Sequence, residues 1–224
     1  MMVLFLLLGY PEAMPLLDSL SYRYHLHCPD TLNLIAKCSI VPDVEFSVLY
    51  VKGDGLEIKK RGEAEDSPFE SVAREIINGA LLLTGLGASE LWQSLGNEKS
   101  IDTVFTKDNW ITILPKATTL FTKAELKIDN WLIRETKIKT EDQDMYAKIE
   151  YKNGLPVNID VKSDTSNEMS YCSKFIIKQE YKKGSTLRIP YKTEIIGESS
   201  EIPDEWKYIV IEYRIVNCKV QIAK

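Results

Sequence analysis

Histidine is almost absent from this chain of 224 residues, which contains only His25 and His27. A serine or cysteine nucleophile of the triad type needs a histidine beside it, and no Gly-x-Ser-x-Gly turn is present. The His25-x-His27 pair is the best metal candidate because alternate strand residues share a face, but no third ligand follows at a regular spacing. We therefore expect no metal site, no catalytic residue and no cofactor, and a protein that is not an enzyme.

Clusters of basic residues and long apolar runs are also lacking. The formal net charge of -5, without a basic patch, argues against nucleic acid as a partner. The apolar run from Val3 to Leu8 is too short to span a bilayer and resembles the centre of a secretory signal, although no Lys or Arg precedes it. We interpret residues 1–13 as a signal-peptide remnant or, alternatively, a first helix, and expect one periplasmic or secreted domain over residues 14–224.

The four cysteines, Cys28, Cys38, Cys172 and Cys218, include no Cys-x-x-Cys pair, so neither a zinc site nor thioredoxin-type redox chemistry is indicated. An even number of cysteines in an exported chain permits disulfides. Cys28 and Cys38 are the candidate pair because Pro29 and Asp30 favour a turn between them. The alternative is four buried thiols that pack as small apolar side chains.

Strand periodicity dominates what is present. Met145, Ala147, Ile149 and Tyr151 alternate with charged residues, Asn153-Gly154 suits a type I′ turn, and the alternation resumes from Leu155 to Val161. The pattern recurs over residues 46–58, 110–138, 171–195 and 206–222, where a change of apolar parity after Ile215 predicts a bulge. This pattern predicts a mainly β (α+β) fold with an antiparallel sheet. Pro115, Pro156 and Pro190 favour a strongly curved, incompletely closed sheet over a closed barrel.

One segment has helical spacing instead. Ser67-Pro68-Phe69-Glu70 combines an N-cap serine, a proline at the first helical position and a capping-box glutamate, and the apolar spacing predicts a helix to about Leu83. Two interpretations stay open. The helix fills the core of the sheet, or it covers a concave face and leaves an apolar pocket beneath it, and both bury the same helix face.

Three stretches carry a resemblance to a known family. The first runs from Ser19 to Gly62 and includes Cys28-Pro29-Asp30 and Tyr50-Val51-Lys52-Gly53-Asp54-Gly55-Leu56-Glu57-Ile58. The second joins the helix and Leu91-Trp92 to Trp110-Ile111-Thr112-Ile113-Leu114-Pro115-Lys116, and the third covers Ile128 to Gly154. Together they resemble the periplasmic lipoprotein-carrier (LolA-type) family and its lipoprotein-sorting relatives.

The resemblance implies a curved antiparallel half-barrel with a helical insertion over its concave face, enclosing an apolar cavity for acyl chains. Phe69, Ile76 and Ile77 would then form the lid side of the cavity, with Trp92 and Trp110 near the rim. The implied ligand is a lipid or an acylated lipoprotein, with an inner-membrane exporter or an outer-membrane acceptor as partner. The alternative class is a ligand-free structural or adhesive β-domain of the cell envelope.

Overall fold

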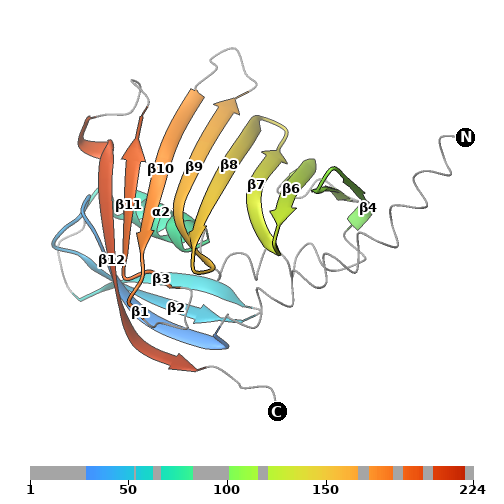
Figure 1. The fold of residues 1–224 in the computed structure, drawn as a ribbon. Coiled ribbons are helices and arrows are strands. Elements are labelled where there is room, and N and C mark those ends of the chain that lie inside the picture. The colour runs from blue at the N-terminus through green and yellow to red at the C-terminus, as the bar shows by residue number, and fades with distance from the viewer. Residues whose placement is uncertain are drawn as a thin grey trace, which may run out of the picture.

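The computed structural model describes residues 29–52, 54–62, 67–82, 101–115, 121–165, 172–183, 189–198 and 204–219. In these ranges twelve strands form one antiparallel sheet (Figure 1). They are β1 (Thr31–Cys38), β2 (Glu45–Val51), β3 (Gly55–Arg61), β4 (Ile101–Lys107), β5 (Trp110–Pro115), β6 (Lys123–Asp129), β7 (Leu132–Lys139), β8 (Gln143–Lys152), β9 (Leu155–Thr165), β10 (Cys172–Glu180), β11 (Lys192–Gly197) and β12 (Tyr208–Lys219).

The strand order is β3-β2-β1-β12-β11-β10-β9-β8-β7-β6-β5-β4. The nine strands from β4 to β12 form a meander, and β1 then pairs with the last strand, β12. β3 and β4 are the two edges, so the sheet is curved but unclosed, which confirms the expected half-barrel. The short helix η1 (Asp204–Trp206) precedes β12.

Local sequence signals account for the tightest hairpins. Asn153 and Gly154 have φ values of 54° and 76°, as the predicted type I′ turn between β8 and β9 requires. The bulge that was predicted from the change of apolar parity after Ile215 is also present. The pairing of β1 with β12 shifts register between Asn33 and Leu34, opposite Asn217 and Ile215, and leaves Val216 as the extra residue. Figure 1 shows β12 bending toward its C-terminal end.

The three prolines lie where a missing N–H group is tolerated. Pro115 is the last residue of β5 and pairs with the edge strand β4, and Pro156 pairs with Tyr151 at the register shift of the β8–β9 hairpin. Pro190 lies just before β11. These positions agree with an unclosed sheet.

The helix α2 (Glu70–Leu82) begins with the capping box that the sequence predicts. The amide of Phe69 donates to Ser67 Oγ at 3.3 Å, and Ser67 N donates to Glu70 Oε1 at 3.0 Å. These two bonds satisfy backbone donors that have no partner within the helix. The boundary therefore lies at the predicted residue.

α2 packs on the concave face over β1 and β3 (Figure 1). Beneath it lies a buried cluster that includes Ile77 and Leu81 of the helix together with side chains of β1, β2 and β12. Leu34, Phe46 and Tyr50 are among its fully buried members, each with 0% of the side chain exposed. Burial of these apolar groups stabilises this half of the sheet and fixes the helix upon it.

Candidate functional site

The concave face of the other half of the sheet carries apolar side chains that are only half-buried. We call the following six residues of β7 to β10 the concave strip: Ile138, Met145, Ala147, Ile149, Val161 and Phe175. Ala147 pairs with Val161, which in turn pairs with Phe175, so these three side chains form a row across β8, β9 and β10. The strip is therefore a continuous apolar surface that the folded chain does not cover fully.

The pairing register shows that the strip faces the helix side of the sheet. Phe175, Ile177 and Gln179 alternate along β10 and share one face. Gln179 is buried, and its Nε2 donates to the carbonyl of Ala80 in α2 at 3.5 Å. Ile177, which is 6% exposed, continues the strip toward the helix. The strip and α2 thus lie on the same face of the sheet.

The chemistry of the strip is apolar and uncharged. Thr136, Ser163 and the buried Ile159 lie beside it on the concave face. At the end of the strip Arg134, two residues before Thr136 on β7, lies with its guanidinium carbon 5.3 Å from the ring centroid of Tyr151. The charged residues of β7 to β9 that alternate with the strip, such as Lys137, Lys148 and Lys162, occupy the opposite face. The six residues of the strip themselves therefore offer no counter-ion to a charged ligand group, whereas a hydrocarbon chain finds a matching surface.

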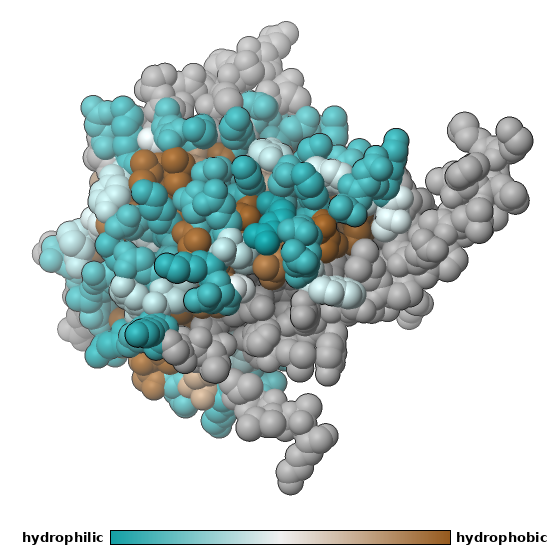
Figure 2. Space-filling view, viewed as in Figure 1, coloured by the Kyte–Doolittle hydropathy of each residue, from teal (hydrophilic) through white to brown (hydrophobic). Residues whose placement is uncertain are grey.

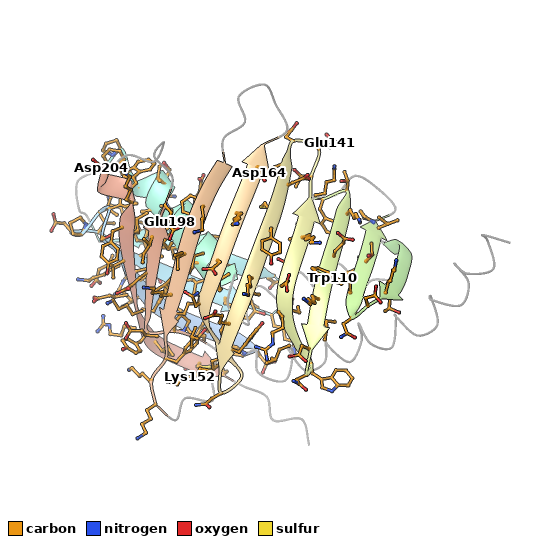
Figure 3. The ribbon with its side chains drawn as sticks, turned by 45° about the horizontal axis from the view of Figure 1, so that its top comes forward. Trp110, Glu141, Lys152, Asp164, Glu198 and Asp204 are labelled. Carbon is orange, nitrogen blue, oxygen red and sulfur yellow. The ribbon has the colours of Figure 1, made fainter. Side chains whose placement is uncertain are left out.

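The opposite, outer face is mostly charged and polar, with smaller apolar patches between these groups (Figures 2 and 3). Glu135 accepts hydrogen bonds from Lys127 Nζ at 2.7 Å and from Tyr146 Oη at 2.8 Å. The lysine bond, helped by the tyrosine bond, holds the pKa of Glu135 below its ordinary value. Loss of solvation, together with the bond to Glu135, raises the pKa of Tyr146. These bonds stabilise the strands without forming a reactive group.

The two isoleucines proposed as a lid differ in burial. Ile77 is fully buried in the cluster beneath α2, and Ile76 is half-buried against it. The two residues therefore pack α2 onto the β1–β3 half of the sheet. The packing of Ile77 favours the interpretation in which the helix fills the core there.

Phe69 and Trp110, two of the aromatic residues proposed for the site, are not brought together on the concave face. Phe69 is 44% exposed and packs edge-to-face on Trp206, with ring centroids 6.0 Å apart. Trp110 alternates with the buried Ile111 and lies on the outer face, where Lys137 Nζ is 4.4 Å from its ring centroid. Figure 3 shows Trp110 toward the β4 edge of the sheet. Trp92 lies outside the described residues.

The cysteine pairing stays a prediction. Cys38 is buried and carries a free thiol among the described residues, and burial raises its pKa. Cys28 lies outside the described residues, as do residues 1–13 and the histidine pair. Cys218 is free and half-buried, and burial raises its pKa as well.

Sequence reasoning missed two features. It recognised the apolar face of the β8–β9 hairpin but did not name its residues as a site, because periodicity shows which face is apolar and not how well it is covered. It also missed a pocket of about 640 Å³ between the β4–β5 and β6–β7 turns, lined by both Trp110 and Trp131. The triplet Asp-Asn-Trp, which occurs at 108–110 and again at 129–131, was the available signal.

Two further properties hold for the part of the chain that the structure describes. None of its helices has the length and apolar character needed to cross a membrane. In the same ranges no three His, Cys, Asp or Glu side chains gather in a way that would hold a metal ion.

Comparison of the chain with protein-family models, with curated proteins and with solved structures finds no match. Function is therefore inferred from the concave strip and its surroundings.

Proposed function

We propose that this protein binds the acyl chain of a lipid or an acylated protein on the concave strip and acts as a carrier outside the cytoplasm. The observation that supports the proposal is the incomplete burial of the row formed by Ala147, Val161 and Phe175 on the helix side of the sheet. Apolar side chains gathered on a concave face are the usual lining of sites for apolar ligands.

The energy available is sufficient for useful binding. Each methylene of an acyl chain that leaves water contributes about 0.8 kcal/mol. Immobilising the chain and the facing side chains offsets part of this gain. A chain of about a dozen carbons still retains a surplus after those costs. The uncharged strip suits the hydrocarbon part of the ligand, so a charged headgroup would stay outside it.

The experiment that tests the proposal introduces a large side chain at the centre of the concave strip. Ala147→Trp places an indole among Val161 and Phe175, whereas Lys148→Trp places the same side chain on the outer face of the same strand. We expect the wild type and Lys148→Trp to take up a fluorescent fatty acid equally, and Ala147→Trp to lose uptake. The denaturation midpoint of each variant is also measured. A loss of uptake counts as evidence only if the variant is folded.

Two results contradict the proposal. The first is a wild type that binds no fatty acid, which would favour a structural or adhesive β-domain. The second is an Ala147→Trp variant that folds and still takes up the probe as the wild type does, which would place binding elsewhere.

A further inference from the structure

The described part of the chain contains three two-residue hairpin loops whose central residues both have positive φ, and one of them is unusual. The central pairs are Asp108-Asn109, Asn130-Trp131 and Asn153-Gly154, with φ values of 51° and 65°, 50° and 63°, and 54° and 76°. Such type I′ turns favour Asn, Asp and Gly, which tolerate the left-handed region. A bulky residue there is a genuine outlier. Only the loop between β6 and β7 carries a tryptophan at the second position.

Burial does not explain why Trp131 occupies that position. The residue is 44% exposed, so its indole does not fill the core. A glycine would adopt the same φ without steric conflict, as Gly154 does in the β8–β9 turn. Strained backbone positions are concentrated at binding sites, active sites and switch regions. The indole of Trp131 is therefore held at the surface by a turn that glycine would suit better.

The indole lines the pocket of about 640 Å³ between the β4–β5 and β6–β7 turns. This volume lies in the range of roughly 300–1,000 Å³ that is typical of small-molecule sites. The other wall is Trp110, which is held from the outer face by Lys137 Nζ at 4.4 Å and Lys127 Nζ at 5.8 Å from its ring centroid. Lys127 is itself bonded to Glu135. The pocket thus has two aromatic walls, Trp110 beside two lysines and Trp131 at the β6–β7 turn.

The polar groups of the pocket point to the class of ligand. Asn109 and Asn130 each offer an amide donor and an amide acceptor, and the charged members of the lining are one cation, Lys107, and one anion, Asp108. The lining is therefore neutral overall and rich in paired donors and acceptors. A sugar ring matches this combination, since its C–H face stacks on indole while its hydroxyls both donate and accept hydrogen bonds.

We propose that this pocket binds a neutral sugar ring, with Trp110 and Trp131 as its apolar walls and Asp108, Asn109 and Asn130 as its hydrogen-bonding groups. A concave, polar-lined pocket fits a discrete ring better than it fits a lipid surface, where Asp108 would be repelled by anionic headgroups. The site is separate from the concave strip, so the two proposals stand or fall independently.

The test is calorimetric titration of the full chain with two neutral oligosaccharides, chitotetraose and maltotetraose. We expect one or both to bind, and Trp131→Gly to weaken binding by roughly tenfold or more, as for an aromatic side chain that carries much of a binding energy. The variant should unfold at the same temperature as the wild type or higher, because glycine relieves the turn. Trp206→Phe, which changes a tryptophan outside the pocket, should leave sugar binding unchanged, as should Ala147→Trp.

Other outcomes overturn the proposal. Absence of binding to both oligosaccharides would do so, as would wild-type binding that Trp131→Gly leaves intact. A Trp131→Gly variant that unfolds at a lower temperature would assign the indole a structural role. Binding of the wild type, but not Trp131→Gly, to vesicles of phosphatidylcholine and phosphatidylglycerol in the absence of sugar binding would identify a membrane anchor instead.

Discussion

Glu70 and Lys60 form an ion pair that fastens the start of α2 to the edge strand β3, with Glu70 Oε1 lying 2.7 Å from Lys60 Nζ. Lys60 pairs with the buried Phe46 across the ladder and therefore lies at a concave position beneath the helix. The same Glu70 oxygen also accepts the capping bond from Ser67 N. One carboxylate thus caps the helix and neutralises a partly buried cation.

Removing that charge should destabilise the fold measurably. Glu70→Gln keeps a residue able to cap the helix but removes the negative charge of Glu70 from the Lys60 ammonium, whose side chain is 17% exposed. We expect a loss of about 2 kcal/mol in the free energy of unfolding, between the values for exposed and buried pairs. Glu57→Gln is the matched control, since the Glu57–Lys59 pair is exposed and should contribute little. Equal effects of the two changes in urea denaturation would contradict this account.

The N-cap residue Ser67 should make a separate contribution to the free energy of unfolding. Ser67→Ala removes the acceptor of the Phe69 amide and should lower the free energy of unfolding by about 1 kcal/mol. Ser67→Asp retains an acceptor at the N-cap and should restore most of the loss. An unchanged denaturation midpoint for Ser67→Ala would mean that the bond contributes nothing to stability.

The packing of Ile77 separates the two interpretations of the helix. Because this side chain is fully buried under α2, Ile77→Trp should overpack the core and cost about 1–3 kcal/mol of stability. Ile76→Trp, at the neighbouring half-buried position, should cost less. If Ile77→Trp instead keeps full stability and loses fatty-acid uptake, the pocket lies directly beneath the helix.

Titration of Glu135 tests the outer-face network. Its pKa is lowered by bonds that exist only in the folded state, so the group adds stability above the ordinary glutamate value near 4.5. That contribution is lost as the pH falls through the lower folded value. Carboxyl NMR should therefore give a midpoint below 4.5 in the wild type, and Lys127→Met should move it upward. Lys123→Met, which removes the partner of Glu125, should leave the midpoint of Glu135 where it is.

Local signals in the sequence predicted much of the fold. The Asn153-Gly154 turn, the Ser67 capping box and the bulge after Ile215 each depend on a few neighbouring residues, and the structure confirms all three. The curved, unclosed antiparallel sheet followed from strand alternation together with the placement of prolines, which are tolerated at sheet edges and bulges. The half-barrel with a helix over its concave face was what the family resemblance implied.

The site residues were harder to predict because their environment is not local. Around Trp110 the residues at both odd and even positions of the strand are apolar. Periodicity therefore could not show that Ile111 faces inward and Trp110 outward. Phe69 shares the helical spacing of the buried face, yet it precedes α2 and packs on Trp206, far along the chain. How fully other parts of the chain bury each half of the sheet depends on tertiary packing, which the alternation of apolar and polar residues does not show.

Native mass spectrometry of gently purified protein tests the central claim most directly. We expect the wild type to carry an additional mass that corresponds to a lipid or an acyl chain, and the Lys148→Trp variant to carry it as well. The Ala147→Trp variant should appear at the mass of the chain alone, because its indole occupies the centre of the concave strip. A wild type that carries no lipid, and that acquires none from added fatty acid, would contradict the account.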